Sequence, residues 1–424
     1  MNQMLSIIRR ITAAIRQPEL SSLRIAIGPI TWGLLLFMVT ILLAGIGCGS
    51  EEVSPTGKSR TTTPSMNTQS TPEKSAPAFE PTVAPNISVF ETGRTAYGFT
   101  TSSPEITSES FMATLESVGR HGDVILVMPQ VPWAEFVDSE DAESTTIQQM
   151  KGTLALAERN GLEAIFVIDP LQAFDRGKIA TFPPSMAGSD FSTPAVRQAF
   201  TNFALRLVRE FEPYYLGLGS EVNTYADAQP DDFENYLSLY RETYSAVKRE
   251  MPDTQVFVTF QWEDLNSVGP FAGDSPGRIK WEIVESFEPE LDVWVISTYP
   301  YFAFDANNPI PEDYYSPLLS QTAKPLAIGE GGYLSENAGA FFGSPERQVA
   351  YLEKLDSQIG ERLAFWIYLI IDDFNVEAYA RHLTDHGSPA DVEAVALFGT
   401  LGLRSYTGEP KPALETWDEL RDTE

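Results

Sequence analysis

The chain has 424 residues, 43% of them hydrophobic, with a formal net charge of −30, three histidines and one cysteine. This apolar share is enough for a large core, so a wholly disordered chain is excluded. One cysteine excludes an intrachain disulfide, and with the histidines spread over the chain no metal or other cofactor is predicted. The strong negative charge repels phosphate backbones, so nucleic acid is not an expected partner.

A hydrophobic run near the N-terminus predicts membrane targeting. Residues Ile25 to Gly47 carry no charge, and four arginines precede them. This pattern predicts a membrane-inserting segment whose N-terminus stays in the cytoplasm, and the run is long enough to span ~30 Å of hydrocarbon. Cys48 follows at once, in the string LLAGIGCGS, which resembles a bacterial lipobox with Cys48 as the lipidated residue. Residues 1–48 are therefore a lipoprotein signal, an uncleaved membrane anchor or an ordinary secretion signal, and each places the rest outside the cytoplasm.

Composition changes sharply after this segment. Residues 49–88 are rich in Ser, Thr and Pro. Such a stretch has too little apolar surface to offset the entropy of ordering, so it predicts a disordered linker. The remaining residues, 89–424, contain no second linker and are expected to form one domain.

Apolar runs alternate with amphipathic stretches throughout this domain. Most runs are continuous, which is typical of parallel strands buried on both faces. The predicted strands are 95–100, 123–128, 163–168, 214–219, 255–260, 291–297, 325–329 and 363–371. Helical patterns between them cover 107–118, 145–159, 193–211, 231–249, 280–287 and 344–359. Eight strands alternating with helices predict an α/β fold, a (β/α)8 TIM barrel. The alternative is an open doubly wound sheet, but no Gly-rich phosphate-binding motif follows the first strand.

Two glutamates follow predicted strands directly, Glu221 after the fourth and Glu330 after the seventh, each flanked by small residues. Chemistry in such a barrel lies at the C-terminal ends of the strands, and the fourth and seventh strands lie on opposite sides of the ring. Two facing carboxyl groups suit glycoside hydrolysis, in which one protonates the leaving oxygen and the other attacks the sugar or activates water. The alternative is that each glutamate caps a following helix or pairs with a loop arginine.

The motifs around these residues resemble clan A retaining glycoside hydrolases. GSEVN is similar to the acid/base motif of the clan, and IGEGGY to the nucleophile motif of its galactanase-like and glucanase-like members. The resemblance, which covers about residues 95 to 420, implies Glu221 as acid/base and Glu330 as nucleophile. It also implies that Tyr299, in STYPYF, hydrogen-bonds the nucleophile, and that Trp366 floors a sugar subsite. The implied activity is cleavage of a β-linked polysaccharide or oligosaccharide through a glycosyl-enzyme.

The chain departs from this pattern at two places. Ser220 precedes the predicted acid/base where the clan usually has an asparagine that contacts the sugar, and Asn223 stands two residues after it. No arginine is evident at the end of the second strand, where many members keep one near the nucleophile. These departures motivate an alternative function: a non-catalytic carbohydrate-binding or surface protein on a degenerate glycosidase barrel.

Other residues at strand ends fit a sugar site less specifically. Aromatic faces stack on sugars and amides bond their hydroxyls, so Gln130, Trp133 and Trp262 are expected to contact substrate, together with Ser220 and Asn223. The stretch from 171 to 192 is expected to form a lid or a subsite wall. Glu263 is a rival catalytic carboxylate, although Asp264 beside it suggests a solvated loop. Asp372 and Asp373 are expected to cap a helix.

Overall fold

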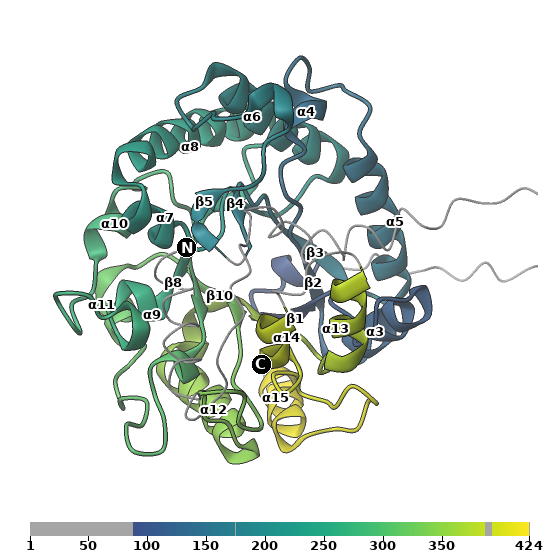
Figure 1. The fold of residues 1–424 in the computed structure, drawn as a ribbon, viewed down its shortest axis with the longest axis vertical. Coiled ribbons are helices and arrows are strands. Elements are labelled where there is room, and N and C mark those ends of the chain that lie inside the picture. The colour runs from purple at the N-terminus through teal and green to yellow at the C-terminus, as the bar shows by residue number, and fades with distance from the viewer. Residues whose placement is uncertain (1–87, 174, 386–391, 424) are drawn as a thin grey trace, which may run out of the picture.

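The structure is a computed structural model that describes residues 88–173, 175–385 and 392–423. A ring of parallel strands forms its centre, with neighbours in the order β7-β6-β3-β2-β1-β11-β10-β9-β8. The two ends of this order, β7 and β8, are separated only by Val258 and are halves of one strand. The sheet is thus a nearly closed barrel with eight strand positions, consistent with the predicted (β/α)8 fold (Figure 1). The strands are β1 (Ala96–Thr100), β2 (Val124–Val127), β3 (Glu163–Val167), β6 (Tyr215–Gly217), β7 (Gln255–Phe257), β8 (Thr259–Gln261), β9 (Trp294–Thr298), β10 (Leu326–Gly331) and β11 (Leu363–Tyr368).

Helices surround the barrel (Figure 1). Those predicted from the sequence are present as α3 (Ser108–His121), α5 (Thr145–Arg159), α6 (Pro194–Phe211), α8 (Pro230–Glu250), α10 (Trp281–Glu285) and α12 (Pro345–Ile359). Their ends follow the local chemistry, because the Ser144 hydroxyl accepts from the backbone of Ile147 at the start of α5. Gly161, just past the end of that helix, has a φ of 75°, a left-handed conformation that glycine adopts without strain.

The remaining elements were not predicted. A two-stranded antiparallel hairpin of β4 (Leu171–Gln172) and β5 (Asp175–Ile179) follows β3. The additional helices are α4 (Trp133–Phe136), α7 (Val222–Ala228), α9 (Trp262–Leu265), α11 (Pro317–Gln321), α13 (Val376–Asp385), α14 (Val392–Phe398) and α15 (Pro412–Thr423). Short 3-10 turns occupy Val89–Glu91, Pro184–Met186, Gly269–Phe271, Pro300–Phe302 and Gly360–Arg362.

Alternation along β11 separates the interior of the barrel from the layer beneath the helices. Phe365 packs against Tyr215 and Phe257 across the barrel, so it faces inward. The next residue, Trp366, points the other way and packs against Trp417 of α15. Side chains on a strand alternate between its two faces, so each strand contributes to both cores.

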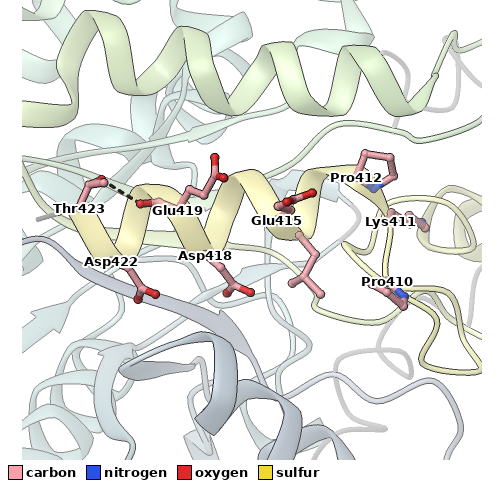
Figure 2. Close-up of a pocket in the computed structure, with 9 residues that line it drawn as sticks. Pro410, Lys411, Pro412, Glu415, Asp418, Glu419, Asp422 and Thr423 are labelled. Carbon is pink, nitrogen blue, oxygen red and sulfur yellow. Dashed lines mark hydrogen bonds between the residues drawn. The ribbon is translucent and has the colours of Figure 1, made fainter.

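The C-terminal segment is tied to the barrel by ion pairs. Asp372 pairs with Arg404 at 2.8 Å and Asp373 with Lys411 at 2.7 Å. The prediction that these aspartates cap a helix is therefore wrong; they hold the segment that leads into α15. Figure 2 shows a pocket along α15, and its lining, residues 410–412, 414, 415, 418, 419, 422 and 423, includes no predicted site residue.

The predicted signal or anchor, Cys48 and nearly all of the predicted linker lie outside the described residues. Within the described ranges, no helix is both long enough and apolar enough to cross a membrane.

Candidate active site

Glu221 stands where β6 turns into α7. Its backbone adopts a left-handed conformation, with φ 51° and ψ 42°, which is uncommon for a residue with a side chain and is often found at functional sites. The Thr259 hydroxyl accepts a hydrogen bond from the Glu221 backbone at 2.8 Å. Although Glu221 occupies the N-cap position of α7, its side chain makes no capping hydrogen bond. The helix-cap alternative therefore does not explain this glutamate.

A β-bulge places Glu330 on the inner face of the barrel. The register of β10 against β9 shifts between Ile328 and Glu330, so that Glu330 lies opposite Ser297. The inserted residue is Gly329; a Cβ there would meet the Val295 side chain at 2.8 Å. Strand side chains alternate, so without this one-residue shift Glu330 would point toward the helices.

The two glutamates are brought together through Ser297. The hydroxyl of Ser297 donates to Glu221 Oε1 at 2.6 Å, and Ser297 is also the strand partner of Glu330. Neighbouring strands lie about 4.8 Å apart, so both carboxyl groups lie at one end of the barrel, beside the same serine.

Arg176, on β5, is the third charged residue of the site. Its Nε donates to Glu221 at 3.3 Å, one terminal nitrogen donates to the Ser220 hydroxyl at 3.3 Å, and the other forms a short ion pair with Asp169. The loop-arginine alternative thus holds for Glu221 but not for Glu330, which accepts no side-chain hydrogen bond from any described residue. Burial alone would lower the pKa of Arg176, but the charges of Asp169, Glu221 and Glu330 together raise it.

Arg176 is not among the residues predicted from the sequence. The family resemblance implies an arginine at the end of the second strand, whereas in the structure the hairpin after β3 supplies one. The stretch expected to be a lid or wall, 171–192, begins with this hairpin. The string LQAFDRGKI carries a turn and a cation directly after a strand end, and that was the available signal.

The environment of Glu330 differs from that of Glu221. Glu330 is only 6% exposed. Burial, followed by the nearby charge of Glu221, raises the pKa of Glu330 to about 8, while Arg176 opposes the shift. Burial also raises the pKa of Tyr299 well above its ordinary value, and Glu330 is the largest charge acting in the same direction. Tyr299 therefore lies near Glu330, but the hydrogen bond that the family resemblance implies between them is not formed among the described residues.

Glu263 is buried behind the barrel wall. It accepts hydrogen bonds from the Gln261 side chain, the Thr298 hydroxyl, the Tyr299 backbone and the Tyr314 hydroxyl, at 2.8 to 3.2 Å. Burial raises its pKa to about 7 against the effect of these donors. Glu263 and Asp264 are 0% and 3% exposed, so the expectation of a solvated loop is wrong. Glu263 fixes the backbone of Tyr299.

The two polar residues beside Glu221 are occupied by protein contacts. Asn223 is fully buried, and both ends of its amide bond the backbone of Gln261, at 2.8 and 3.1 Å. Its predicted contact with substrate is contradicted, because no donor or acceptor faces outward; it anchors α7 to β8. Ser220 is 1% exposed and accepts from both Arg176 and the Thr259 hydroxyl at 3.3 Å, so it supports Arg176 instead.

The predicted tryptophan platforms are all core residues. Trp133, Trp262 and Trp366 are 3%, 0% and 0% exposed. Trp133 packs against Phe182, and Trp262 lies among rings that include Trp281. Their predicted sugar contacts are therefore contradicted by burial. Gln130 is half-buried and forms a strand bridge to Asp169 at the ends of β2 and β3, so its predicted role stays open.

These groups define a class of site: a barrel whose strand ends hold two carboxyl groups, one paired with a cation and one isolated. One protonated and one ionised carboxyl group are what a general acid and a nucleophile or base require. No group of three or more histidine, cysteine, aspartate or glutamate side chains in the described parts of the chain could hold a metal ion.

Comparison with known proteins supports the fold. No protein-family profile and no curated protein matches the chain. Among solved structures it is similar to exo-β-1,4-mannosidase Op5Man5 from Opitutaceae bacterium strain TAV5, with a TM-score of 0.57 and 14% identity over 78% of this chain. It is also similar to GH5_18 variants crystallised with Manβ1-4GlcNAc, from Bifidobacterium longum and from Streptomyces cattleya, each with a TM-score of 0.54 and 14% identity, over 78% and 77% of this chain. The chain spans 60% of the length of the mannosidase and 78% and 80% of the GH5_18 proteins. At this identity the likeness concerns the barrel fold.

Proposed function

We propose that the chain is a retaining β-glycosidase in which Glu330 attacks the anomeric carbon and Glu221 is the acid/base. The observation that carries this proposal is the meeting of Glu221 and Glu330 beside Ser297, from strands far apart in the chain. In the first step the C–O bond to the leaving group breaks as Glu330 bonds to the sugar, and Glu221 gives its proton to the departing oxygen. In the second step Glu221 takes a proton from water, whose oxygen replaces Glu330.

The neighbouring structures support a β-linked glycan as the substrate, because they include a protein named as a β-1,4-mannosidase and proteins crystallised with a β1-4-linked disaccharide. The test uses the full chain on β-mannoside, β-glucoside and β-galactoside substrates. Turnover with retained anomeric configuration, followed by NMR, is expected in the wild type. We expect Glu330→Gln to lose more than about 1,000-fold in kcat, and Glu353→Gln, on the exposed side of α12, to act as wild type.

A specific observation favours a second candidate, the non-catalytic carbohydrate-binding protein. The side chains of Ser297 and Arg176 donate hydrogen bonds to Glu221, whereas no side chain of the described residues donates one to Glu330. A nucleophile must be ionised, and hydrogen-bond donors favour that form. Glycan binding without turnover by the wild type, detected by calorimetry, would establish this function and refute the enzyme.

The location outside the cytoplasm is also a proposal. The supporting features are the apolar run that ends at Gly47 and the cysteine that follows it. If Cys48 is lipidated, metabolic labelling with a fatty acid marks the wild type and not Cys48→Ser. An unlabelled protein that stays in the membrane fraction would instead be held by an uncleaved anchor.

A further inference from the structure

We propose that Arg176 is the positioning residue of the carboxyl pair: fixed by Asp169, its guanidinium holds Glu221 in place and sets the pH range in which the pair keeps one proton. This inference rests on the proposed glycosidase function and deepens it. It concerns how the site is regulated by pH, not which sugar it takes.

The hairpin and α7 hold the Arg176 guanidinium between Asp169 and Glu221. Asp169 is fully buried, and its two oxygens accept from the Leu171 backbone and from Arg176. β5 packs against α7: a Cβ on Gly177 would meet the Ala228 side chain at 2.9 Å, and Glu221 stands at the start of the same helix. The guanidinium is therefore held from both sides. Figure 1 shows the hairpin beside α7.

Arg176 lies among several carboxylates. The carboxylates acting on it are Asp169 after β3, Glu221 at α7 and Glu330 on β10. On its own strand, Lys178 pairs with Asp175 at 2.9 Å. Arg176 is 8% exposed and touches two of the three site carboxylates directly, so its charge acts in a poorly solvated environment. Tyr299 faces the same glutamates, but it is neutral at physiological pH.

The direction of the effect follows. Arg176 stabilises the ionised form of the pair, and it lowers the pKa of Glu330 against burial and the charge of Glu221. Without the guanidinium, the two glutamates should lose their one remaining proton at a higher pH. The Glu221 carboxylate should also lose the fixed donor that orients it, because Arg presents a planar fork that a lysine cannot reproduce.

The experiment compares the full-length wild type with Arg176→Gln, Arg176→Lys and the control Lys178→Gln. Lys178 lies two residues further along β5 and its side chain is 41% exposed. For Arg176→Gln we expect kcat/KM at pH 7 to fall about 10- to 100-fold. The pKa that governs the alkaline decline of kcat/KM should rise by about one unit. In Arg176→Lys the pKa of this alkaline decline should stay within about half a unit of the wild-type value, while kcat falls in part. The control should match wild type in both.

A second readout keeps this test separate from that of the proposed function. The Glu330 carboxyl can be titrated by ¹³C NMR in labelled protein, assigned with Glu330→Gln, whether or not the protein turns over a glycan. A wild type without turnover refutes the glycosidase, whereas an unmoved Glu330 midpoint in Arg176→Gln refutes the inference about Arg176. If Arg176→Gln does not fold because Asp169 is left unpaired, Asp169→Asn/Arg176→Gln removes both charges. The midpoint of the Glu330 titration in this double variant should still rise, but by less than in Arg176→Gln. An unchanged midpoint would again refute the inference.

Discussion

Replacing Glu330 by glutamine should stabilise the protein, and increasingly so as the pH rises. Glutamine has the shape of the protonated acid but cannot ionise. Glu330 is 6% exposed and accepts no side-chain hydrogen bond from the described residues, so its charged form is poorly compensated. The variant should therefore lack a cost that the wild type bears whenever this group is ionised.

The magnitude follows from the shift in pKa. Burial and the Glu221 charge raise the pKa of Glu330 from 4.5 to about 8. The folded state binds this proton more tightly than the unfolded state, so the contribution to stability is complete below pH 4.5 and is lost as the pH rises through about 8. At about 1.4 kcal/mol per unit, Glu330→Gln should gain roughly 3 kcal/mol over wild type at pH 7 and roughly 5 kcal/mol above pH 8, as upper limits.

Urea unfolding of wild type and variant at pH 5, 7 and 9 measures the difference, since titrating groups that do not interact with Glu330 cancel in it. The exposed Glu353→Gln is the control and should show a difference near zero at each pH. A stability gain for Glu330→Gln that is constant over this range would refute the reasoning, and so would a variant less stable than wild type at pH 9. Either result would mean that the carboxylate is well compensated in the folded state.

Two further substitutions test the packing around the site. Glu263→Gln should destabilise the protein, because glutamine offers one acceptor oxygen where four groups now donate to two carboxylate oxygens, and the Thr298 and Tyr314 hydroxyls would have to turn and accept. We expect a loss of about 2 kcal/mol by urea unfolding, with a fall in kcat as Tyr299 shifts. Trp366→Phe should cost about 1–2 kcal/mol by thinning the contact with Trp417, and it should leave KM unchanged. A raised KM in this variant, with stability unaffected, would contradict the buried position of the tryptophan.

The sequence predicted the barrel well because its signals are local. Continuous apolar runs marked the strands, and capping residues marked helix ends closely; α5 begins and ends where its prediction did, at Thr145 and Arg159. The positions of Glu221 and Glu330 followed from the same alternation, since charged residues directly after buried strands lie at one end of a parallel barrel.

The inward or outward direction of a side chain was harder to predict. Trp366 was expected in the site because of its strand, yet alternation from the inward Phe365 sends it under α15. Glu330 faces inward only because of a register shift, which no short sequence pattern marks. Arg176 comes from β5 of the hairpin after β3, and its contact with Glu221, 45 positions away, depends on tertiary packing.

The pair of glutamates also predicts a pH profile. Double displacement needs one proton and one charge shared between Glu221 and Glu330, and the pKa of about 8 marks the loss of that proton. The kcat/KM of wild type should therefore fall about tenfold per unit above pH 8, because no general acid remains. The raised pKa favours a proton on Glu330 in the free protein, and no described side chain donates a hydrogen bond to this carboxyl group. A sugar hydroxyl that donates to Glu330 would therefore favour its ionisation and leave the proton for Glu221. In Glu221→Gln, assayed with an aryl glycoside whose leaving group needs no acid, the rate should instead rise with pH through a midpoint below 8 and then stay level. Burial still raises the Glu330 pKa in this variant, but the charge of Glu221 no longer adds to it. A wild-type profile without an alkaline decline up to pH 9.5 would contradict the shared proton, and a Glu221→Gln profile that still falls above pH 8 would show that another group titrates.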